Sequence, residues 1–167
     1  SAASTGKYER MVIFRSNTEA GIKLGFLPGD MREKFGPYCD PIFHTLEFLL
    51  RHKHGKERIP AKEIKGTIDH LLDTGQLIIQ PPNFVRGNTY HDAIIIIDDA
   101  QNFEVGLLKL IMSRAGENSR IILTGDPTQI DSKILTAADC GVIRAAHDFR
   151  GLPAYGGIYL SESKRSY

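Results

Sequence analysis

An apolar run that ends in two acids constrains the fold of this chain more than any other feature. Residues 93–97 read AIIII, and Asp98 and Asp99 follow at once. Because apolar and polar residues do not alternate in the run, it predicts a strand buried on both faces, as in a parallel sheet covered by helices. The aspartates then lie at the carboxyl end of the strand, where open α/β sheets bind their ligands.

The rest of the chain alternates between strand and helix patterns. Further strands are predicted at 11–14, 77–80, 120–123 and 157–160. Strands that alternate with helices over short connections predict right-handed crossovers and a parallel sheet. The expected fold class is therefore α/β, with a parallel β-sheet flanked by helices.

Helical spacing of apolar residues predicts the helices between these strands. The first is expected from Met31 to about His54, broken early or restarted by Pro37 and Pro41. A second is expected from Ala61 to Thr74, stopped by Gly75 in the place of a C-terminal cap. Two more are expected after Asn102, as a helix N-cap, and over about 136–149.

Length and composition exclude several classes of protein. The chain has 167 residues, which fits one domain, and its net charge is only +1, so any nucleic-acid footprint must be a local patch. Cys39 and Cys140 lie far apart, in no metal-ligand spacing, and are expected to be small buried residues in a reducing cytosol. No apolar run approaches the roughly 18 residues that span a bilayer, so we expect no membrane contact and a cytoplasmic location.

A second polar strand end strengthens the expectation of a ligand site. Thr124, Asp126 and Gln129 follow the strand at 120–123, as the aspartate pair follows the strand before it. An acid after an apolar strand can hold Mg²⁺ through a water, since Mg²⁺ prefers hard oxygen ligands. The neighbouring carboxylate would then orient an attacking water. The alternative is a solvated turn in which one aspartate caps a helix.

Two segments together resemble a known family. IIIIDDAQN (94–102) and ILTGDPTQID (122–131) are similar to segments of the PhoH-like proteins, P-loop ATPases related to the motor core of superfamily 1 helicases. Segments 16–30 and 83–93 resemble the same family, and the match is collinear from about Tyr8 to the C-terminus. The resemblance implies a P-loop NTPase core of the RecA or helicase type that binds ATP and Mg²⁺.

The resemblance also implies roles for single residues. Asp98 would coordinate Mg²⁺. Asp99 stands where the family usually has glutamate and would polarise the hydrolytic water, although its side chain is one methylene shorter than that of glutamate. Asp126 would lie on the nucleotide side, and Gln129 would sense the γ-phosphate. Arg165 would stabilise charge on the transferring phosphoryl group, unless it is only an exposed residue of the C-terminal tail.

One part of the family pattern is missing. The phosphate-binding loop, G-x-x-x-x-G-K-[ST], should lie upstream of the strand at 11–14. STGK at 4–7 does not match, because no glycine stands five positions before Gly6 and Tyr8 follows Lys7. We expect residues 1–167 to form a single, partial domain without its first strand and phosphate loop, and to bind Mg-ATP weakly by itself.

Basic residues after strands suggest nucleic-acid contacts. The resemblance would place Arg15 and Arg86 on RNA or single-stranded DNA. The alternatives are a structural salt bridge for Arg15 and a tight turn at 86–88 for Arg86. The basic stretch at 51–58 is better explained as a solvated helix end. The resemblance also allows a homo-oligomer.

Three functions follow from these expectations. The first is an ATP-binding PhoH-like protein, a nucleic-acid-dependent ATPase or helicase-like motor or switch. The second is an ATP-independent nucleic-acid or protein-binding module that has lost turnover, which Asp99 in place of glutamate would favour. The third is a metal-dependent nuclease, which needs Asp98, Asp99 and Asp126 gathered around two metal ions.

Overall fold

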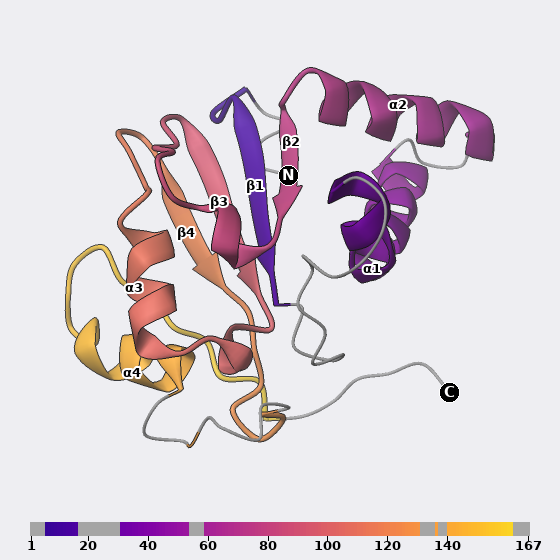
Figure 1. The fold of residues 1–167 in the computed structure, drawn as a ribbon. Coiled ribbons are helices and arrows are strands. Elements are labelled where there is room, and N and C mark those ends of the chain that lie inside the picture. The colour runs from indigo at the N-terminus through magenta and orange to yellow at the C-terminus, as the bar shows by residue number, and fades with distance from the viewer. Residues whose placement is uncertain (1–5, 17–30, 54–58, 131–135, 137–139, 162–167) are drawn as a thin grey trace.

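A four-stranded parallel sheet forms the centre of the molecule (Figure 1). The computed structural model describes residues 6–16, 31–53, 59–130, 136 and 140–161. The strands are β1 (Arg10–Arg15), β2 (Leu77–Gln80), β3 (Ala93–Asp98) and β4 (Arg120–Leu123). Their order is β2-β1-β3-β4, and each neighbouring pair is parallel, which confirms the predicted fold class.

Helices cover both faces of the sheet (Figure 1). α1 (Met31–Lys53) and α2 (Ala61–Asp73) lie on one side, and α3 (Val105–Met112) and α4 (Gly141–Asp148) lie on the other. Two short 3₁₀ turns, η4 (Pro82–Phe84) and η5 (Ala100–Asn102), follow β2 and β3. The sheet is therefore the middle of three layers. The loops that follow the strands lie at its carboxyl edge.

The two inner strands are buried on both faces, as their unbroken apolar sequence predicts. Val12 and Phe14 of β1 and Ile95 and Ile97 of β3 are fully buried on the side of α3 and α4. Ile13 of β1 packs on the other side, in the core formed with α1 and β2. The register of these strands places Arg15 opposite Asp98.

The predicted break in the first helix is wrong, because α1 runs on through both prolines. A proline inside a helix removes one backbone hydrogen bond, and packing of the apolar face can compensate for that loss. Ile42 packs with Ile13 and Leu77 in the core beneath α1, with Leu46 against them. α1 has 23 residues, yet none of the helices in the described ranges is long and apolar enough to cross a membrane.

α2 ends as predicted. Its last residue is Asp73, and Gly75 follows in the left-handed conformation with φ of 69°. The amide of Gly75 donates to the carbonyl of Leu72, which satisfies one of the free carbonyls at the helix end. A side chain at position 75 would strain this turn, so glycine is suited to it.

The predicted cap at Asn102 is wrong. Asn102 belongs to η5, and α3 begins only at Val105, after Glu104. Between them Phe103 is extended and 1% exposed, and its carbonyl accepts a hydrogen bond from the amide of Gly141. The chain therefore seats the Phe103 ring in the core before it turns into a helix.

The C-terminal part differs most from the prediction. α4 begins at Gly141, because Cys140 is still extended and forms an antiparallel bridge with Glu104. Residues 157–160 do not form a strand, and the predicted strand there is wrong. Ile158, Tyr159 and Leu160 are 90%, 85% and 83% exposed. Apolar sequence alone does not make a strand, since its backbone groups need a paired neighbour.

Both cysteines are free and buried, as expected. Burial, together with the nearby charge of Asp40, raises the pKa of the Cys39 thiol to about 11. A thiol with so high a pKa is almost entirely protonated at neutral pH and is a poor nucleophile.

Candidate functional site at the carboxyl edge of the sheet

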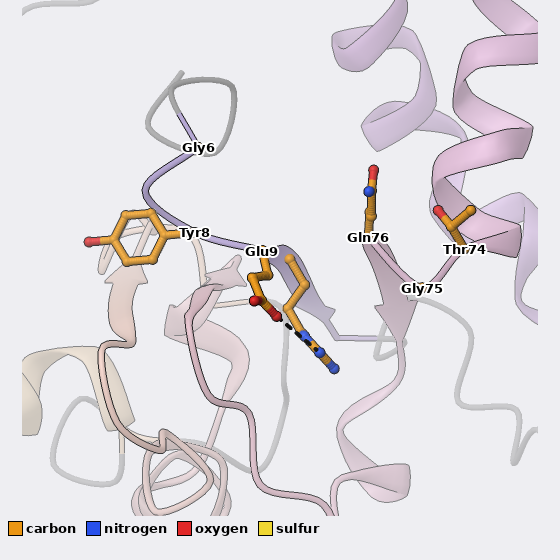
Figure 2. Close-up of a pocket in the computed structure, with 7 residues that line it drawn as sticks. Gly6, Tyr8, Glu9, Thr74, Gly75 and Gln76 are labelled. Atoms are coloured by element: carbon orange, nitrogen blue, oxygen red, sulfur yellow. Dashed lines mark ion pairs between the residues drawn. The ribbon is translucent and has the colours of Figure 1, made fainter.

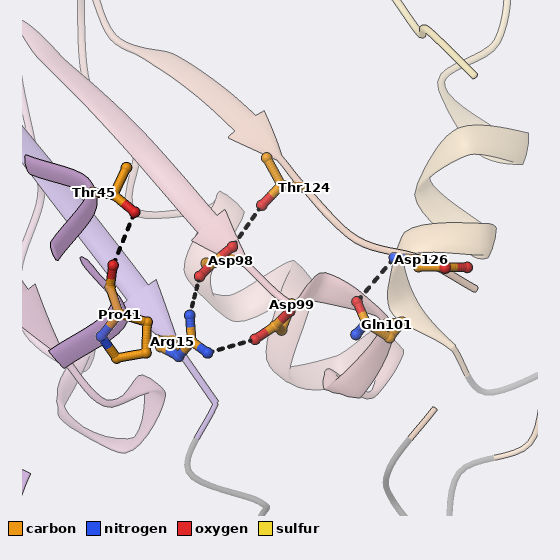
Figure 3. Close-up of polar contacts among 8 residues, drawn as sticks. All are labelled: Arg15, Pro41, Thr45, Asp98, Asp99, Gln101, Thr124 and Asp126. Carbon is orange, nitrogen blue, oxygen red and sulfur yellow. Dashed lines mark hydrogen bonds and ion pairs between the residues drawn. The ribbon is translucent and has the colours of Figure 1, made fainter. Parts of the chain in front are cut away.

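The sheet register brings the side chains of Arg15 and Thr124 to Asp98 (Figure 3). Arg15 ends β1, Asp98 ends β3, and Thr124 directly follows β4. Nη1 of Arg15 lies 2.5 Å from Oδ2 of Asp98, and the hydroxyl of Thr124 donates to Oδ1 of Asp98 at 2.9 Å. In the part of the chain that the structure describes, one oxygen of Asp98 is thus paired with the end of β1 and the other with the residue that follows β4.

Asp99 shares the same arginine. Its Oδ2 lies 3.1 Å from Nη2 of Arg15, so one guanidinium bridges both aspartates (Figure 3). The backbone of Asp99 is left-handed, with φ of 52° and ψ of 44°, a conformation that aspartate tolerates better than most residues. This turn ends the strand and leads the chain into η5. The side chains of Arg15, Asp98 and Asp99 are 19%, 30% and 40% exposed, so solvent reaches the carboxylates.

The loop after β4 is organised around Asp126. Its Oδ1 accepts hydrogen bonds from the amide of Thr128 at 2.9 Å and from the hydroxyl at 2.7 Å. Its Oδ2 accepts a hydrogen bond from the side-chain amide of Gln129 at 2.6 Å. These bonds favour the ionised form, and they lower the pKa of the Asp126 carboxyl, with the hydroxyl of Thr128 contributing most. Gln129 is thereby held by Asp126 at the same edge of the sheet as Asp98.

Gln101 connects the two strand ends, and sequence reasoning gave it no role. Its side chain is buried, and its Oε1 accepts a hydrogen bond from the amide of Asp126 at 3.2 Å (Figure 3). The amide of Ala100 also donates to the carbonyl of Thr124, at 2.8 Å. The sequence has no repeating pattern that identifies a buried glutamine in a 3₁₀ turn. The contact of Gln101 with Asp126 follows only once β3 and β4 are known to be neighbours.

Gly125 is required by the close approach of these loops. A Cβ atom at this position would lie 2.6 Å from Oε1 of Gln101 and 3.2 Å from the amide nitrogen of Ala100. We therefore expect Gly125→Ala to push the two loops apart and to lower the free energy of unfolding by about 1–3 kcal/mol. Urea denaturation followed by circular dichroism measures this change.

Gly106 provides the matched control for Gly125. It lies in α3 with open space around the place of a Cβ atom. Alanine there is expected to leave stability unchanged or raise it by up to about 1 kcal/mol, since alanine is the better helix former. Equal effects of the two substitutions would show that the contact with Gln101 does not require glycine at 125.

The predicted basic residues have different surroundings. Arg15 makes the salt bridges described above, which was the structural alternative considered for it. Arg86 is exposed, in a turn where Gly87 has a φ of 85°, as the tight-turn alternative requires. Nucleic-acid contact by either residue stays a prediction. Arg165 lies outside the described residues.

The chemistry of the Asp98 site fits a hydrated divalent cation. Carboxylate and hydroxyl oxygens are the hard ligands that Mg²⁺ takes, and one or two protein carboxylates with several waters form its usual shell. Asp98 would hold the ion, which would supply charge neutralisation for phosphate oxygens. Within the described part of the chain, no three side chains of His, Cys, Asp or Glu are grouped closely enough to hold a metal by themselves.

A hollow in the surface lies away from this site. It has a volume of about 530 Å³ and is lined by residues from 6–10 and 74–76, where β1 and β2 begin (Figure 2). Parallel strands place their ligand sites at the carboxyl edge, whereas this hollow lies at the amino edge. The hollow therefore does not lie where this fold is expected to bind a ligand.

The layout of the sheet and its edge defines a class of protein. A parallel sheet covered by helices, with an acid and a hydroxyl on adjoining strand ends, is consistent with a P-loop NTPase core. The chain belongs to the PhoH-like protein family, whose model matches residues 1–164.

Curated relatives support this membership. The chain is 35% identical over 162 residues to Protein PhoH2 of Bacillus subtilis, a match that covers 96% of this chain and 34% of that protein. It is also 35% identical over 162 residues to a PhoH-like protein of Bacillus subtilis, covering 97% and 46%. A PhoH-like protein of Synechocystis is 37% identical over 123 residues, covering 74% and 34%. The chain thus spans between a third and a half of the length of these relatives.

Proposed function

We propose that this chain is part of a nucleic-acid-dependent ATPase, a PhoH-like motor or switch that acts on RNA or single-stranded DNA. The observation that carries the proposal is the pairing of Asp98 with Thr124 across two adjacent parallel strands, at 2.9 Å. This pairing puts a candidate Mg²⁺ ligand and the loop of Gln129 on one rim, in a chain whose family implies nucleotide binding.

The proposal assigns each polar residue a task on that rim. Asp98 holds the Mg²⁺ of Mg-ATP through water, and Asp99 orients the attacking water. Gln129, held by Asp126, reads the γ-phosphate, and Arg165 is proposed to neutralise the charge that develops on the phosphoryl group. Arg86, which is exposed, and Arg15 are proposed to meet the nucleic acid. A homo-oligomer belongs to the same proposal.

The proposal also requires a phosphate-binding loop, which this sequence does not contain. The outer edge of β4 supports a place for it, because no described strand pairs with that edge. Ile122 of β4 is also 39% exposed. We propose that a preceding segment of the protein adds a strand beside β4, with the phosphate loop at its carboxyl end, next to Asp98 and Thr124.

Phosphate release tests this function directly. A longer chain that includes the upstream segment of the gene is expected to hydrolyse ATP in the presence of Mg²⁺, and to do so faster when single-stranded RNA is added. The present chain, assayed beside it, is expected to release little phosphate, since the loop supplies most contacts to the β- and γ-phosphates. Absence of release by the longer chain, with and without RNA or single-stranded DNA, would refute the ATPase.

A binding module without turnover is the second candidate. One observation favours it: Asp99, which the resemblance places where the family usually has glutamate, is paired with Arg15 at 3.1 Å. Binding of labelled RNA that is the same with and without ATP would support the module. We do not propose the nuclease, because in the described residues Asp126 does not join Asp98 and Asp99 in a metal-binding group.

A further inference from the structure

Arg15 contacts one of the two carboxylate oxygens with which Asp98 could hold a cation. Its guanidinium contributes one nitrogen to Asp98 and the other to Asp99, at 2.5 Å and 3.1 Å. These residues are far apart in sequence and meet because the register of β1 and β3 places them opposite one another. The geometry is that of an internal counter-ion shared by two carboxylates.

The charges make this arrangement a competition. Two carboxylates and one guanidinium leave a net charge of −1 at the site, where two carboxylates alone would leave −2. A divalent ion beside Asp98 would also lie close to the positive charge of Arg15 and be repelled by it. Thr124 holds the other oxygen of Asp98 with a neutral hydroxyl, so it opposes a cation far less.

We propose that Arg15 is a positioning residue that competes with the divalent cation for Asp98. While the guanidinium bridges Asp98 and Asp99, the cation binds weakly, and the withdrawal of Arg15 opens the site. The inference rests on the proposed function, in which Asp98 holds the ion. In the proposed function Arg15 also binds a nucleic-acid phosphate. A guanidinium that binds this phosphate leaves the two carboxylates, and Asp98 is then free to hold the cation.

Mn²⁺ binding to this chain tests the competition without nucleotide. Mn²⁺ replaces Mg²⁺ as the probe because it broadens the NMR signals of nearby nuclei. The amides of residues 97–100 and 124 in ¹⁵N-labelled protein are the reporters. Replacing Arg15 by glutamine removes its charge, and we expect Mn²⁺ to bind roughly tenfold more tightly, the size expected for a unit charge about 5 Å from a divalent ion in water.

Three further variants separate charge from packing. Arg15→Met keeps an apolar stem without charge and is expected to behave like Arg15→Gln. Arg15→Lys keeps the charge without the bidentate fork, so its Mn²⁺ affinity is expected to stay within about threefold of wild type. Arg15→Gln combined with Asp98→Asn is expected to lose the gain, because the cation then has no carboxylate to take over.

The outcomes are decisive in both directions. Tighter binding in both neutral variants, absent in the lysine variant and abolished with Asp98→Asn, supports the competition. Unchanged or weaker Mn²⁺ binding in Arg15→Gln and Arg15→Met overturns it, as does a gain that survives Asp98→Asn. The measurement involves no ATP, so a failure of the ATPase in the longer chain would be recorded separately.

Discussion

Replacing Asp98 by alanine is expected to lower Mg²⁺-dependent ATP turnover by the longer chain on the order of a thousandfold. The physical reason is the loss of the proposed Mg²⁺ ligand, since metal stabilisation of transferring phosphoryl groups contributes several kcal/mol and about 1.4 kcal/mol corresponds to tenfold in rate. Steady-state phosphate release at saturating ATP and Mg²⁺ measures the effect.

The same substitution is expected to change folding little. The Asp98 side chain is 30% exposed, and Arg15 keeps its pair with Asp99 after the change. A partly exposed ion pair contributes up to about 1 kcal/mol, so the urea midpoint should move only slightly. A loss above about 3 kcal/mol would assign Asp98 a structural role and would remove the turnover result as support for metal binding.

Asp148 is the matched control for Asp98. It is also a carboxylate paired with an arginine, with Arg144 at 2.6 Å, but it lies at the end of α4 on the surface. Asp148→Ala is expected to leave turnover unchanged. An equal loss of turnover in both variants would show that the assay responds to surface charge and not to the strand-end acid.

Replacing Phe14 by alanine is expected to give the largest loss of stability. The ring is fully buried in the central strand and packs edge-on against Tyr90, with ring centroids 6.3 Å apart. Truncation removes its burial and leaves a cavity, which costs about 3–5 kcal/mol in a well-packed core. A domain of ordinary stability has only about 5–15 kcal/mol in total, so a large share would be lost. Urea denaturation measures it.

Phe48 is the control for Phe14. It lies on α1, and it is 59% exposed. Phe48→Ala is expected to change the free energy of unfolding by no more than about 0.5 kcal/mol. If Phe14→Ala cost as little as this, the face of β1 toward α3 and α4 would have to be loosely packed.

Sequence patterns predicted the sheet because its signal is local. Residues 93–97 and 121–123 are short apolar runs rich in isoleucine with polar residues directly after them, a pattern that favours strands. The first is buried as predicted, whereas β4 is only partly buried, because no described strand covers its outer edge. α2 was predicted equally well, since Gly75 marks its end. The ends of these elements are marked by residues next to them in the sequence.

The predictions that failed depend on contacts between distant residues. Prolines in α1 are tolerated because Ile42 packs on β1 and β2, and α3 starts late because Phe103 is first placed in the core. The strand expected at 157–160 has the right composition, but a strand also needs a neighbour. The sequence around each of these elements does not specify the distant residue that it contacts, although that contact decides where the element begins or whether it forms.

In the candidate site, too, the residues that follow strands could be predicted from the local sequence, whereas the contacts between strands could not. Asp98, Asp126 and Gln129 could be predicted because each follows an apolar strand, and parallel strands end at a common edge. The pairing of Arg15 with both aspartates could only be named as an alternative, because register decides which side chains meet. Their roles in binding and turnover stay predictions.

The tie between Gln101 and Asp126 has a mechanical consequence. With a second hydrogen bond between Ala100 and Thr124, it couples the segment after β3 to the segment after β4 at two points. Moving the segment after β3 without the segment after β4 would break both hydrogen bonds, at a cost of about 0.5–1.5 kcal/mol each. The two hydrogen bonds therefore favour joint over separate displacement of the two strand ends.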